Sequence, residues 1–346
     1  MNIVYGPVPS RRLGMSLGVD PIPKLTCTFD CIYCQLGKKR YIVSGPEEVE
    51  ERFPTPEKIA TAVKEALSKR THVDYITFSG SGEPTLNPRI AEAVVAIRKF
   101  TDIPIVLITN SSLLTHPEVL EAAALFDLVL PSLDAGDQET FLRVNRPARG
   151  FEIEAIANAI GRLARRVPIW LEVMLVESEK ERMNTDPDSI GHLIEKIRLI
   201  RPHEVNLNTC VRPPEEQIDP VPEEKLNEIR ERMESELPEV PIVIVPKRTR
   251  SRSKLLHEKE IAREILRLLA VRPCTPTDLS DSLGINPAEV GKYLARLAEE
   301  EGIGRRLQNG RVYYTASGGA VSGEGFTAPP RSAEELRDRK IESSGD

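Results

Sequence analysis

The segment KLTCTFDCIYCQLGKK, residues 24–39, carries three of the five cysteines in the chain. These three, Cys27, Cys31 and Cys34, have the spacing C-x3-C-x2-C and closely follow a short apolar run. Three thiolates on one tight loop can bind three irons of a [4Fe–4S] cube, whereas electron-carrying clusters are usually held by four cysteines. The spacing therefore predicts a cluster with one open iron, which a reactive cofactor can coordinate.

Two plainer interpretations of the same loop stay open. A structural zinc site needs four closed ligands, and Cys210 or Cys274 would have to supply the fourth, although neither lies in a paired motif. The three cysteines are alternatively buried apolar thiols. An odd number of cysteines, three of them clustered, favours a reducing cytoplasm and a metal site over a disulfide scaffold.

On both sides of this loop, short runs rich in Val, Ile and Leu alternate with stretches of helical period. The apolar runs span residues 16–20, 74–80, 103–110, 128–134, 169–176, 204–211 and 240–245. Runs that are apolar on both faces, separated by amphipathic helices, indicate a parallel sheet covered by helices. The pattern fits a doubly wound sheet and an incomplete barrel equally, and in both the chemistry belongs at the carboxyl ends of the strands.

Composition narrows the function classes further. A length of 346 residues suggests two domains, and 40% hydrophobic side chains are enough for a buried core. The formal net charge of -6 argues against a wholly basic nucleic-acid wrapper. The sequence has neither an apolar run of about 18 residues nor a secretory signal, so we predict a cytoplasmic protein without a membrane partner.

The sequence CTFDCIYC resembles the signature of the radical S-adenosylmethionine (SAM) superfamily, including the aromatic Tyr33 before the last cysteine. The wider segment, residues 6–37, resembles a branch of that superfamily related to the wyosine-forming enzymes of tRNA. The resemblance implies a [4Fe–4S] cluster, S-adenosyl-L-methionine as cofactor, and an electron donor such as flavodoxin or ferredoxin. It also implies an α/β fold in which an incomplete (β/α)6 TIM-like barrel holds both cofactors.

Polar residues at the ends of the predicted strands are the candidate SAM contacts. In SGSGEPT, Gly80 and Gly82 permit close backbone approach, and Glu83 can accept a hydrogen bond from an ammonium group. This stretch is similar to the glycine-rich GGE motif of the superfamily, which holds the amino group of SAM, although Ser81 replaces the middle glycine. The alternative is an ordinary turn closed by Gly and Pro.

Two further strand ends and one strand interior carry polar groups. Thr109 and Asn110 end one predicted strand, and each is as readily a helix cap as a ligand contact. Ser132 and Asp134 belong to SLDA, which resembles the stretch whose serine contacts SAM in the molybdenum-cofactor cyclase. Glu172 lies inside a strand, where an unpaired carboxylate is costly.

Contacts with the SAM ribose would explain Glu172, as would a salt bridge to Arg143 or Arg146. For the substrate, the candidates are Asn206 and Asn208, on one face of a strand, and the adjacent Arg11 and Arg12, which suit a phosphate or carboxylate. Surface arginines would look the same in sequence.

The C-terminal part of the chain is a separate, basic module. We predict a partial barrel over 1–245, a basic linker over 246–256, a winged helix-turn-helix domain over 257–316 and a disordered tail over 317–346. The recognition helix is expected at 287–300, and Asn309-Gly310 marks the hairpin of the wing. Its basic side chains are Lys292, Arg296, Arg305, Arg306 and Arg311.

Basic side chains in this position suit a nucleic-acid backbone, but a protein-interaction module of the same shape stays open. The acidic run at 299–301 counts against nucleic acid. Together these features predict a radical SAM enzyme that abstracts hydrogen from an unidentified substrate, with RNA the leading candidate. The alternative is an iron–sulfur redox sensor that controls transcription through the winged domain. A second set of three cysteines, as in wyosine-forming enzymes, is not visible.

Overall fold

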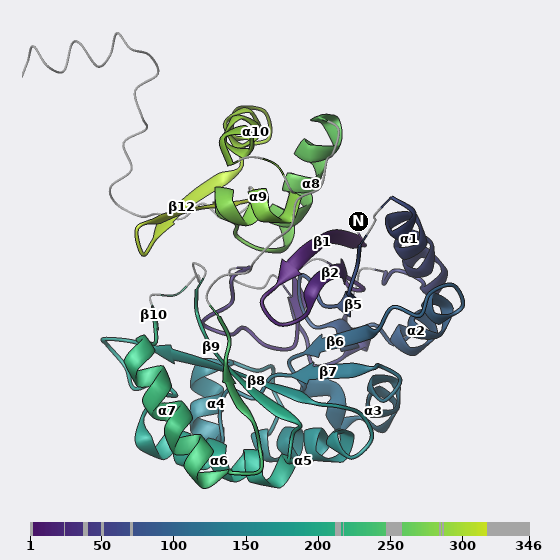
Figure 1. Cartoon of the computed structure of the whole chain (residues 1–346). Helices are drawn as coiled ribbons and strands as arrows, with labels where there is room; N and C mark the ends of the chain where they lie inside the picture. Colours follow the sequence, from purple (N-terminus) through teal and green to yellow (C-terminus); the bar gives the residue numbers. More distant parts are fainter. Residues whose placement is uncertain are drawn as a thin grey trace, which may run out of the picture.

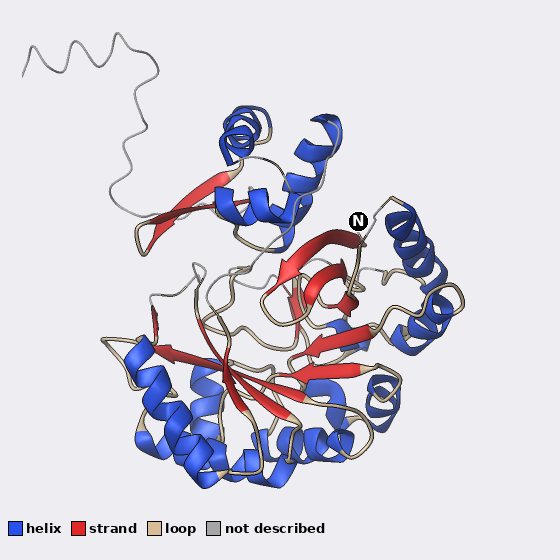
Figure 2. Ribbon diagram, in the orientation of Figure 1, coloured by secondary structure: helices blue, strands red, loops and turns tan. Residues whose placement is uncertain are grey.

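The computed structural model describes residues 3–23, 25–36, 41–49, 52–69, 72–211, 216, 218–246, 258–283, 285 and 287–316. Its larger part is a curved layer of strands with helices on the outer side (Figure 2). The smaller part, the three helices and hairpin after residue 257, lies over the N-terminal strands (Figure 1).

Parallel strands make up most of the curved layer, and all seven predicted apolar runs contribute one. They are β2 (Gly14–Val19), β5 (Tyr75–Phe78), β6 (Ile105–Thr109), β7 (Leu128–Pro131), β8 (Trp170–Glu177), β9 (Glu204–Thr209) and β11 (Ile242–Ile244). The strand order is β1-β2-β5-β6-β7 in one sheet and β10-β8-β9-β11 in the other. Isolated parallel bridges, Val129 to Ile169 and Ser132 to Glu172, join β7 to β8 and make the layer continuous.

The helices connect successive parallel strands and cover the outside. They are α1 (Pro56–Ser68), α2 (Ile90–Arg98), α3 (Pro117–Ala123), α4 (Gln138–Val144), α5 (Ile153–Ala164), α6 (Pro187–Ile200) and α7 (Glu223–Glu236). Short 3-10 turns follow or precede them at Pro46–Glu48, Pro84–Leu86 and Ser112–Thr115. Pro56, Pro117 and Pro187 open their helices, as expected from the fixed φ and missing N–H of proline.

Helix α5 shows why these segments pack as they do. Ile153, Ile156, Ile160 and Leu163 recur at helical spacing, and all are buried against the sheet. In the described residues, the end strands β1 and β11 do not pair with each other. The predicted incomplete barrel is therefore confirmed, with an open side at the N-terminal strands.

One edge strand was not predicted. β1 (Val4–Ser10) runs antiparallel to β2, with a register shift between Tyr5 and Val8. Its sequence, VYGPVPS, contains Pro7 and Pro9, which cannot donate to a ladder and are tolerated only at an edge or a bulge. The short strands β3 (Thr26–Cys27), β4 (Tyr41–Ile42) and β10 (Asp219–Pro220) were also missed, because two residues show no period.

The smaller part has the predicted winged helix-turn-helix order. It comprises α8 (Glu258–Val271), α9 (Pro276–Leu283), α10 (Pro287–Glu300) and the hairpin of β12 (Gly304–Gln308) and β13 (Arg311–Thr315). The hairpin turn is Asn309-Gly310, both with positive φ. Of the predicted linker over 246–256, residues 247–256 lie outside the described residues, as does the predicted tail over 317–346, so the four-part division stays a prediction. Among the described helices, none has the length and apolar character needed to cross a membrane.

Candidate functional site

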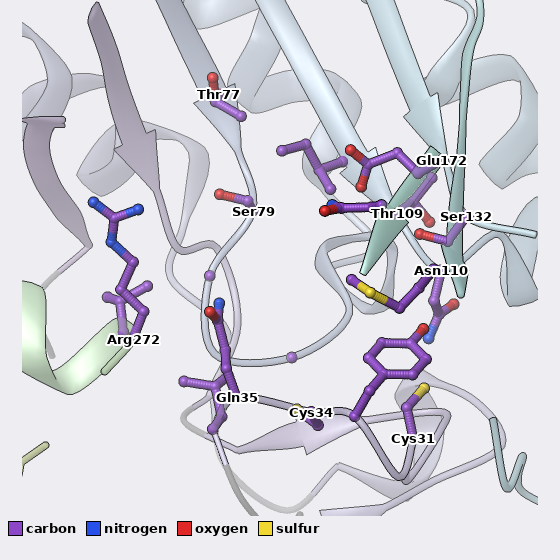
Figure 3. A pocket seen from close by; sticks show the side chains of 18 of the residues that line it. Cys31, Cys34, Gln35, Thr77, Ser79, Thr109, Asn110, Ser132, Glu172 and Arg272 are labelled. Atoms are coloured by element: carbon purple, nitrogen blue, oxygen red, sulfur yellow. The ribbon is translucent and has the colours of Figure 1, made fainter. Parts of the chain in front are cut away.

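A cavity of about 380 Å³ lies at the carboxyl ends of the parallel strands (Figure 3). Eleven of the twelve predicted cofactor and metal residues line it; Asp134 is the exception. The eleven are Cys27, Cys31, Tyr33, Cys34, Gly80, Gly82, Glu83, Thr109, Asn110, Ser132 and Glu172. The strand ends that the sequence singled out therefore converge on one space.

The cysteine loop is anchored to the barrel by an aromatic side chain. Phe29 is buried, and its ring makes edge contacts with Phe141 at 5.3 Å and Phe151 at 5.9 Å between centroids. The backbone N–H of Ile32 donates to the carbonyl of Val144 at 3.1 Å. These contacts fix the loop against α4 and the segment before α5.

Amide side chains reach the sulfurs from two other elements. Asn110 Nδ2 lies 3.6 Å from the sulfur of Cys27, and Asn145 Nδ2 lies 3.5 Å from that of Cys31. Burial raises the pKa of the Cys31 thiol well above its usual value, and the charges of Asp134 and the other two cysteines raise it further. A positively charged iron site would offset this cost, because metal ligands must be deprotonated.

Two glycines let the next strand end lie against the cysteine loop. A Cβ on Gly82 would meet the carbonyl oxygen of Thr26 at 1.7 Å, so only glycine fits there. The neighbouring N–H of Glu83 donates to that same carbonyl at 3.2 Å. Gly80 has a φ of +142, and a Cβ there would meet the carboxyl of Asp20 at 2.4 Å.

Glu83 is 1% exposed and faces the cavity with hydrogen bonds on both oxygens. Oε1 accepts from the hydroxyls of Thr85 at 2.6 Å and Thr109 at 2.7 Å, and Oε2 accepts from the backbone N–H of Asn110 at 2.7 Å. Burial raises the pKa of Glu83, and these hydrogen bonds act in the opposite direction. The carboxylate is thereby held in one orientation, with Oε2 able to accept another donor.

The Asp134 side chain is buried behind the cavity wall and does not line the cavity. Its carboxylate accepts hydrogen bonds from the hydroxyl of Tyr33, from Asn145 Nδ2 at 2.6 Å and from the backbone N–H of Met174 at 2.8 Å. Asp134 therefore positions Tyr33, which does line the cavity.

Glu172 forms an ion pair with Arg12. The predicted partners are wrong: Arg143 pairs with Glu139, and Arg146 with Glu216. The reason is β1, whose presence brings the β1–β2 turn, and with it Arg12, to the open side of the barrel.

The predicted substrate residues separate into two groups. Arg11, Arg12 and Asn208 line the cavity, and Arg11 Nη1 donates to Asn208 Oδ1 at 3.1 Å. Asn206 does not line it; its side-chain amide donates to Glu204 at 3.0 Å.

Other lining residues were missed in the sequence. Thr77 and Ser79 alternate along β5 and its end, a period-2 pattern of polar groups that could have marked them. Tyr5 comes from the unpredicted β1, and its hydroxyl lies 2.7 Å from that of Ser79. Arg272 comes from the end of α8 in the winged-helix domain, and no pattern in the sequence indicates that the two domains share a wall.

The donors present fit the two predicted cofactors. Three thiols on one side of the cavity, two with amide N–H groups beside them, suit a cluster held by three cysteines. Of the two proposed fourth zinc ligands, Cys274 is buried in the winged-helix core and does not line the cavity, whereas Cys210 lines the same cavity as the three cysteines. In the described parts of the chain, no three or more His, Cys, Asp or Glu side chains are grouped to hold a single metal ion, as a closed zinc site requires, whereas in a cubane each thiolate binds a different iron.

Comparisons with known proteins agree with this geometry. Residues 22–185 match the model of the radical SAM superfamily, and residues 259–302 match that of the bacterial regulatory proteins of the arsR family. The crystal structure of Streptococcus suis SuiB bound to precursor peptide SuiA is similar in fold, with a TM-score of 0.50 and 13% identity over 66% of this chain and 48% of that chain.

Two curated relatives extend over nearly the whole chain. A protein named GTPase Obg from Brachyspira hyodysenteriae is 31% identical over 91% of this chain, which spans only 45% of that relative's length. A UPF0026 protein of Helicobacter pylori (strain ATCC 700392 / 26695) is 34% identical over 91% of this chain and 97% of its own length. Radical SAM proteins use a [4Fe–4S] cluster and SAM, which confirms the predicted cofactors. The chain belongs to the UPF0026 family and is a member of the radical SAM superfamily.

Proposed function

We propose that this protein reductively cleaves SAM at a cluster held by Cys27, Cys31 and Cys34 and abstracts hydrogen from a substrate bound in the same cavity. The convergence of the cysteine loop and the strand-end residues on one cavity is the observation that carries the proposal. When bound, the cluster supplies an electron that splits SAM into methionine and a 5′-deoxyadenosyl radical. The electron donor is a small redox protein such as flavodoxin or ferredoxin.

The residues of the chain bind SAM and hold it in one orientation in the cavity. Glu83 Oε2 accepts from the ammonium group of SAM, because its carboxylate is buried, fixed by Thr109 and Asn110, and faces the cavity. Gly80 and Gly82 let the ligand approach the backbone. Ser132 and Glu172 follow on neighbouring strands and contact the rest of the nucleoside, with Arg12 holding the Glu172 carboxylate in place.

RNA is the proposed substrate class. The basic side chains predicted for the winged-helix domain lie on α10 and the hairpin, and Lys292, Arg296, Arg305 and Arg311 are exposed. The guanidinium of Arg296 lies 5.3 Å from the ring of Tyr293, and that of Arg305 lies 5.4 Å from the ring of Tyr314. Such exposed cations suit a phosphate backbone.

The test is anaerobic reconstitution with iron and sulfide, followed by dithionite, SAM and measurement of 5′-deoxyadenosine by mass spectrometry. The wild type is expected to form the nucleoside. Cys34→Ala should lose nearly all of it, whereas Cys274→Ala, which changes a cysteine outside the cavity, should retain it. A wild type that forms none, or a Cys34→Ala variant as active as the wild type, contradicts the proposal.

The second candidate function is an iron–sulfur sensor that regulates transcription. The match of residues 259–302 to the arsR family of regulatory proteins is the observation that favours it. A cluster that does not react with SAM, together with sequence-specific DNA binding whose affinity changes with cluster oxidation, would support the sensor over the enzyme.

A further inference from the structure

The winged-helix domain forms part of the cavity wall. Val271 and Arg272, at the end of α8, line the same space as the cysteines. Figure 3 shows Arg272 entering from the opposite side to Cys31, on the ribbon of the C-terminal domain. The cavity is therefore built by both domains.

Contacts between the domains fix the position of that wall. Tyr5 and Val8 of β1 belong to the same hydrophobic cluster as the buried residues of α8, among them Ile265 and Leu268. The backbone N–H of Gly6 donates to Glu264 Oε1 at 3.1 Å in a buried contact. On the other side of the domain, the hydroxyl of Tyr313 donates to the carbonyl of Val211 at 2.8 Å.

The Arg272 guanidinium lacks a counter-charge among the described residues. Its Nε is buried and has no hydrogen-bond partner there, and no ion pair involves it. Arg272 as a whole is half-buried, and a guanidinium whose buried Nε lacks a hydrogen-bond partner is better suited to binding an anion than to facing an empty cavity.

Arg11 is the second cation on this side of the cavity. Its hydrogen bond to Asn208 is to a neutral oxygen, whereas Arg12 beside it is compensated by Glu172. Burial and the positive charges of Arg12 and Arg272 lower the pKa of Arg11 to about 10, and Asp278 acts against this with a smaller effect. The neighbourhood of Arg11 is thus positive on balance.

We propose that Arg11 and Arg272 together bind a phosphate group of the substrate, which makes the winged-helix domain a substrate-binding wall of the radical SAM cavity. This inference rests on the proposed function, because it assigns the substrate to the same cavity. Two guanidinium forks match the three terminal oxygens of a phosphate, whereas a carboxylate, with two oxygens, is satisfied by one fork. The positive balance around both arginines also matches the negative charge of a phosphate.

The test measures binding of inorganic phosphate to the reconstituted full-length protein by isothermal titration calorimetry. Arg272→Gln and Arg11→Gln are each expected to weaken binding by about tenfold or more, because each removes charge-assisted hydrogen bonds. Arg272→Lys should fall between wild type and Arg272→Gln, since it keeps the charge and loses the fork. Arg263→Gln, on the exposed side of α8, is the matched control and should bind like the wild type.

Two phosphate sources are compared in the same assay. Ribose 5-phosphate represents a small phosphorylated substrate, and a 5′-phosphorylated RNA oligonucleotide represents nucleic acid. The ligand whose affinity exceeds that of inorganic phosphate and falls in Arg272→Gln identifies the source.

The outcomes separate this inference from the proposed function. A wild type that forms 5′-deoxyadenosine, with phosphate affinities equal in Arg272→Gln and Arg263→Gln, overturns the phosphate site alone. Arg272-dependent phosphate binding in a protein that never forms 5′-deoxyadenosine supports the phosphate site and overturns the proposed chemistry. A wild type that binds none of the three ligands overturns the inference.

Discussion

The buried carboxylate of Asp134 holds Tyr33, Asn145 and the backbone of Met174 with three hydrogen bonds. Burial raises the pKa of Asp134, and the hydrogen bonds it accepts work in the opposite direction. Because Tyr33 belongs to the cysteine loop and Asn145 contacts Cys31, this carboxylate links the loop to β8.

Asp134→Asn is expected to lower the free energy of unfolding by roughly 1–3 kcal/mol. The side-chain NH2 of asparagine would face one of the donors from which the carboxylate accepts a hydrogen bond, so that bond would be lost. Urea unfolding followed by the fluorescence of Trp170, the single tryptophan, reports on the barrel. Tyr33→Phe removes only the hydroxyl that donates to Asp134, so it should lower the free energy of unfolding by less than Asp134→Asn does. If Asp134→Asn lowers the free energy of unfolding no more than Asp102→Asn, at an exposed position before β6, this role of Asp134 is contradicted.

At this scale the sequence predicted which side chains gather, but not which of them pair. Ser132 lies in the cavity wall because it directly follows the parallel strand β7, and strand ends can be located from apolar runs; Glu172 reaches the cavity from inside β8. The ion pair of Glu172 with Arg12 depends on the place of the β1–β2 turn, and the partners chosen from the sequence were wrong. Pairing depends on which strands are neighbours, and this information is not local.

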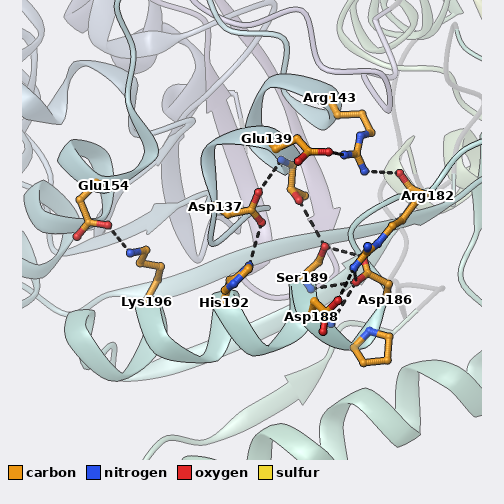
Figure 4. Close-up of polar contacts among 12 residues, drawn as sticks. Asp137, Glu139, Arg143, Glu154, Arg182, Asp186, Asp188, Ser189, His192 and Lys196 are labelled. Atoms are coloured by element: carbon orange, nitrogen blue, oxygen red, sulfur yellow. Dashed lines mark hydrogen bonds and ion pairs between the residues drawn. The ribbon is translucent and has the colours of Figure 1, made fainter.

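At the scale of elements, α6 shows how one capping residue ties several segments together (Figure 4). The carboxylate of Asp186 accepts from the backbone N–H of Ser189 at 3.1 Å and forms an ion pair with Arg182. Burial by itself would raise the pKa of Asp186, but the hydrogen bonds from Arg182 and Ser189 outweigh it and hold the pKa well below the usual value.

A lowered pKa in the folded state means that ionised Asp186 stabilises the fold at neutral pH. That stabilisation is present above the unfolded-state pKa, near 4, and is lost as the pH falls toward the lowered value. Asp186→Asn keeps a good cap but loses the charge. Its deficit in unfolding free energy relative to wild type should be largest at pH 7 and shrink below about pH 4. Glu195→Gln, on the exposed face of α6, is the control, and a deficit that is constant with pH would contradict the assignment.

The elements themselves were largely predictable. Seven apolar runs became strands, and three of the barrel helices, α1, α3 and α6, begin at prolines, because both features act over a few residues. β1 was missed because Pro7 and Pro9 oppose a strand locally, and only its edge position makes the strand acceptable.

At the scale of the whole molecule, the two domains share a hydrophobic cluster and a buried polar contact. Gly6 lies where β1 and β2 shift register, and its N–H donates to Glu264 of α8. Glu264 is 4% exposed and also pairs with Arg267. In the docked domains, Glu264 accepts a hydrogen bond from a backbone donor that is buried in the contact.

Glu264→Ala is expected to weaken docking by about 1–3 kcal/mol, the cost of an unsatisfied buried donor. Hydrogen exchange followed by mass spectrometry should show faster exchange in the peptide that contains Gly6. Glu264→Gln retains an acceptor and should stay close to wild type. Equal exchange in both variants would show that this contact does not hold the domains together.

A cavity whose wall belongs to a second domain has a thermodynamic consequence. If a molecule bound to α10 tightens ligand binding inside the barrel by holding Arg272 in the cavity wall, that ligand must tighten the binding of the molecule to α10 by the same factor. Under this reciprocity, α10 would act as an effector site for the cavity. Ligand binding in the cavity would then change affinity at α10 as strongly as binding at α10 changes affinity in the cavity.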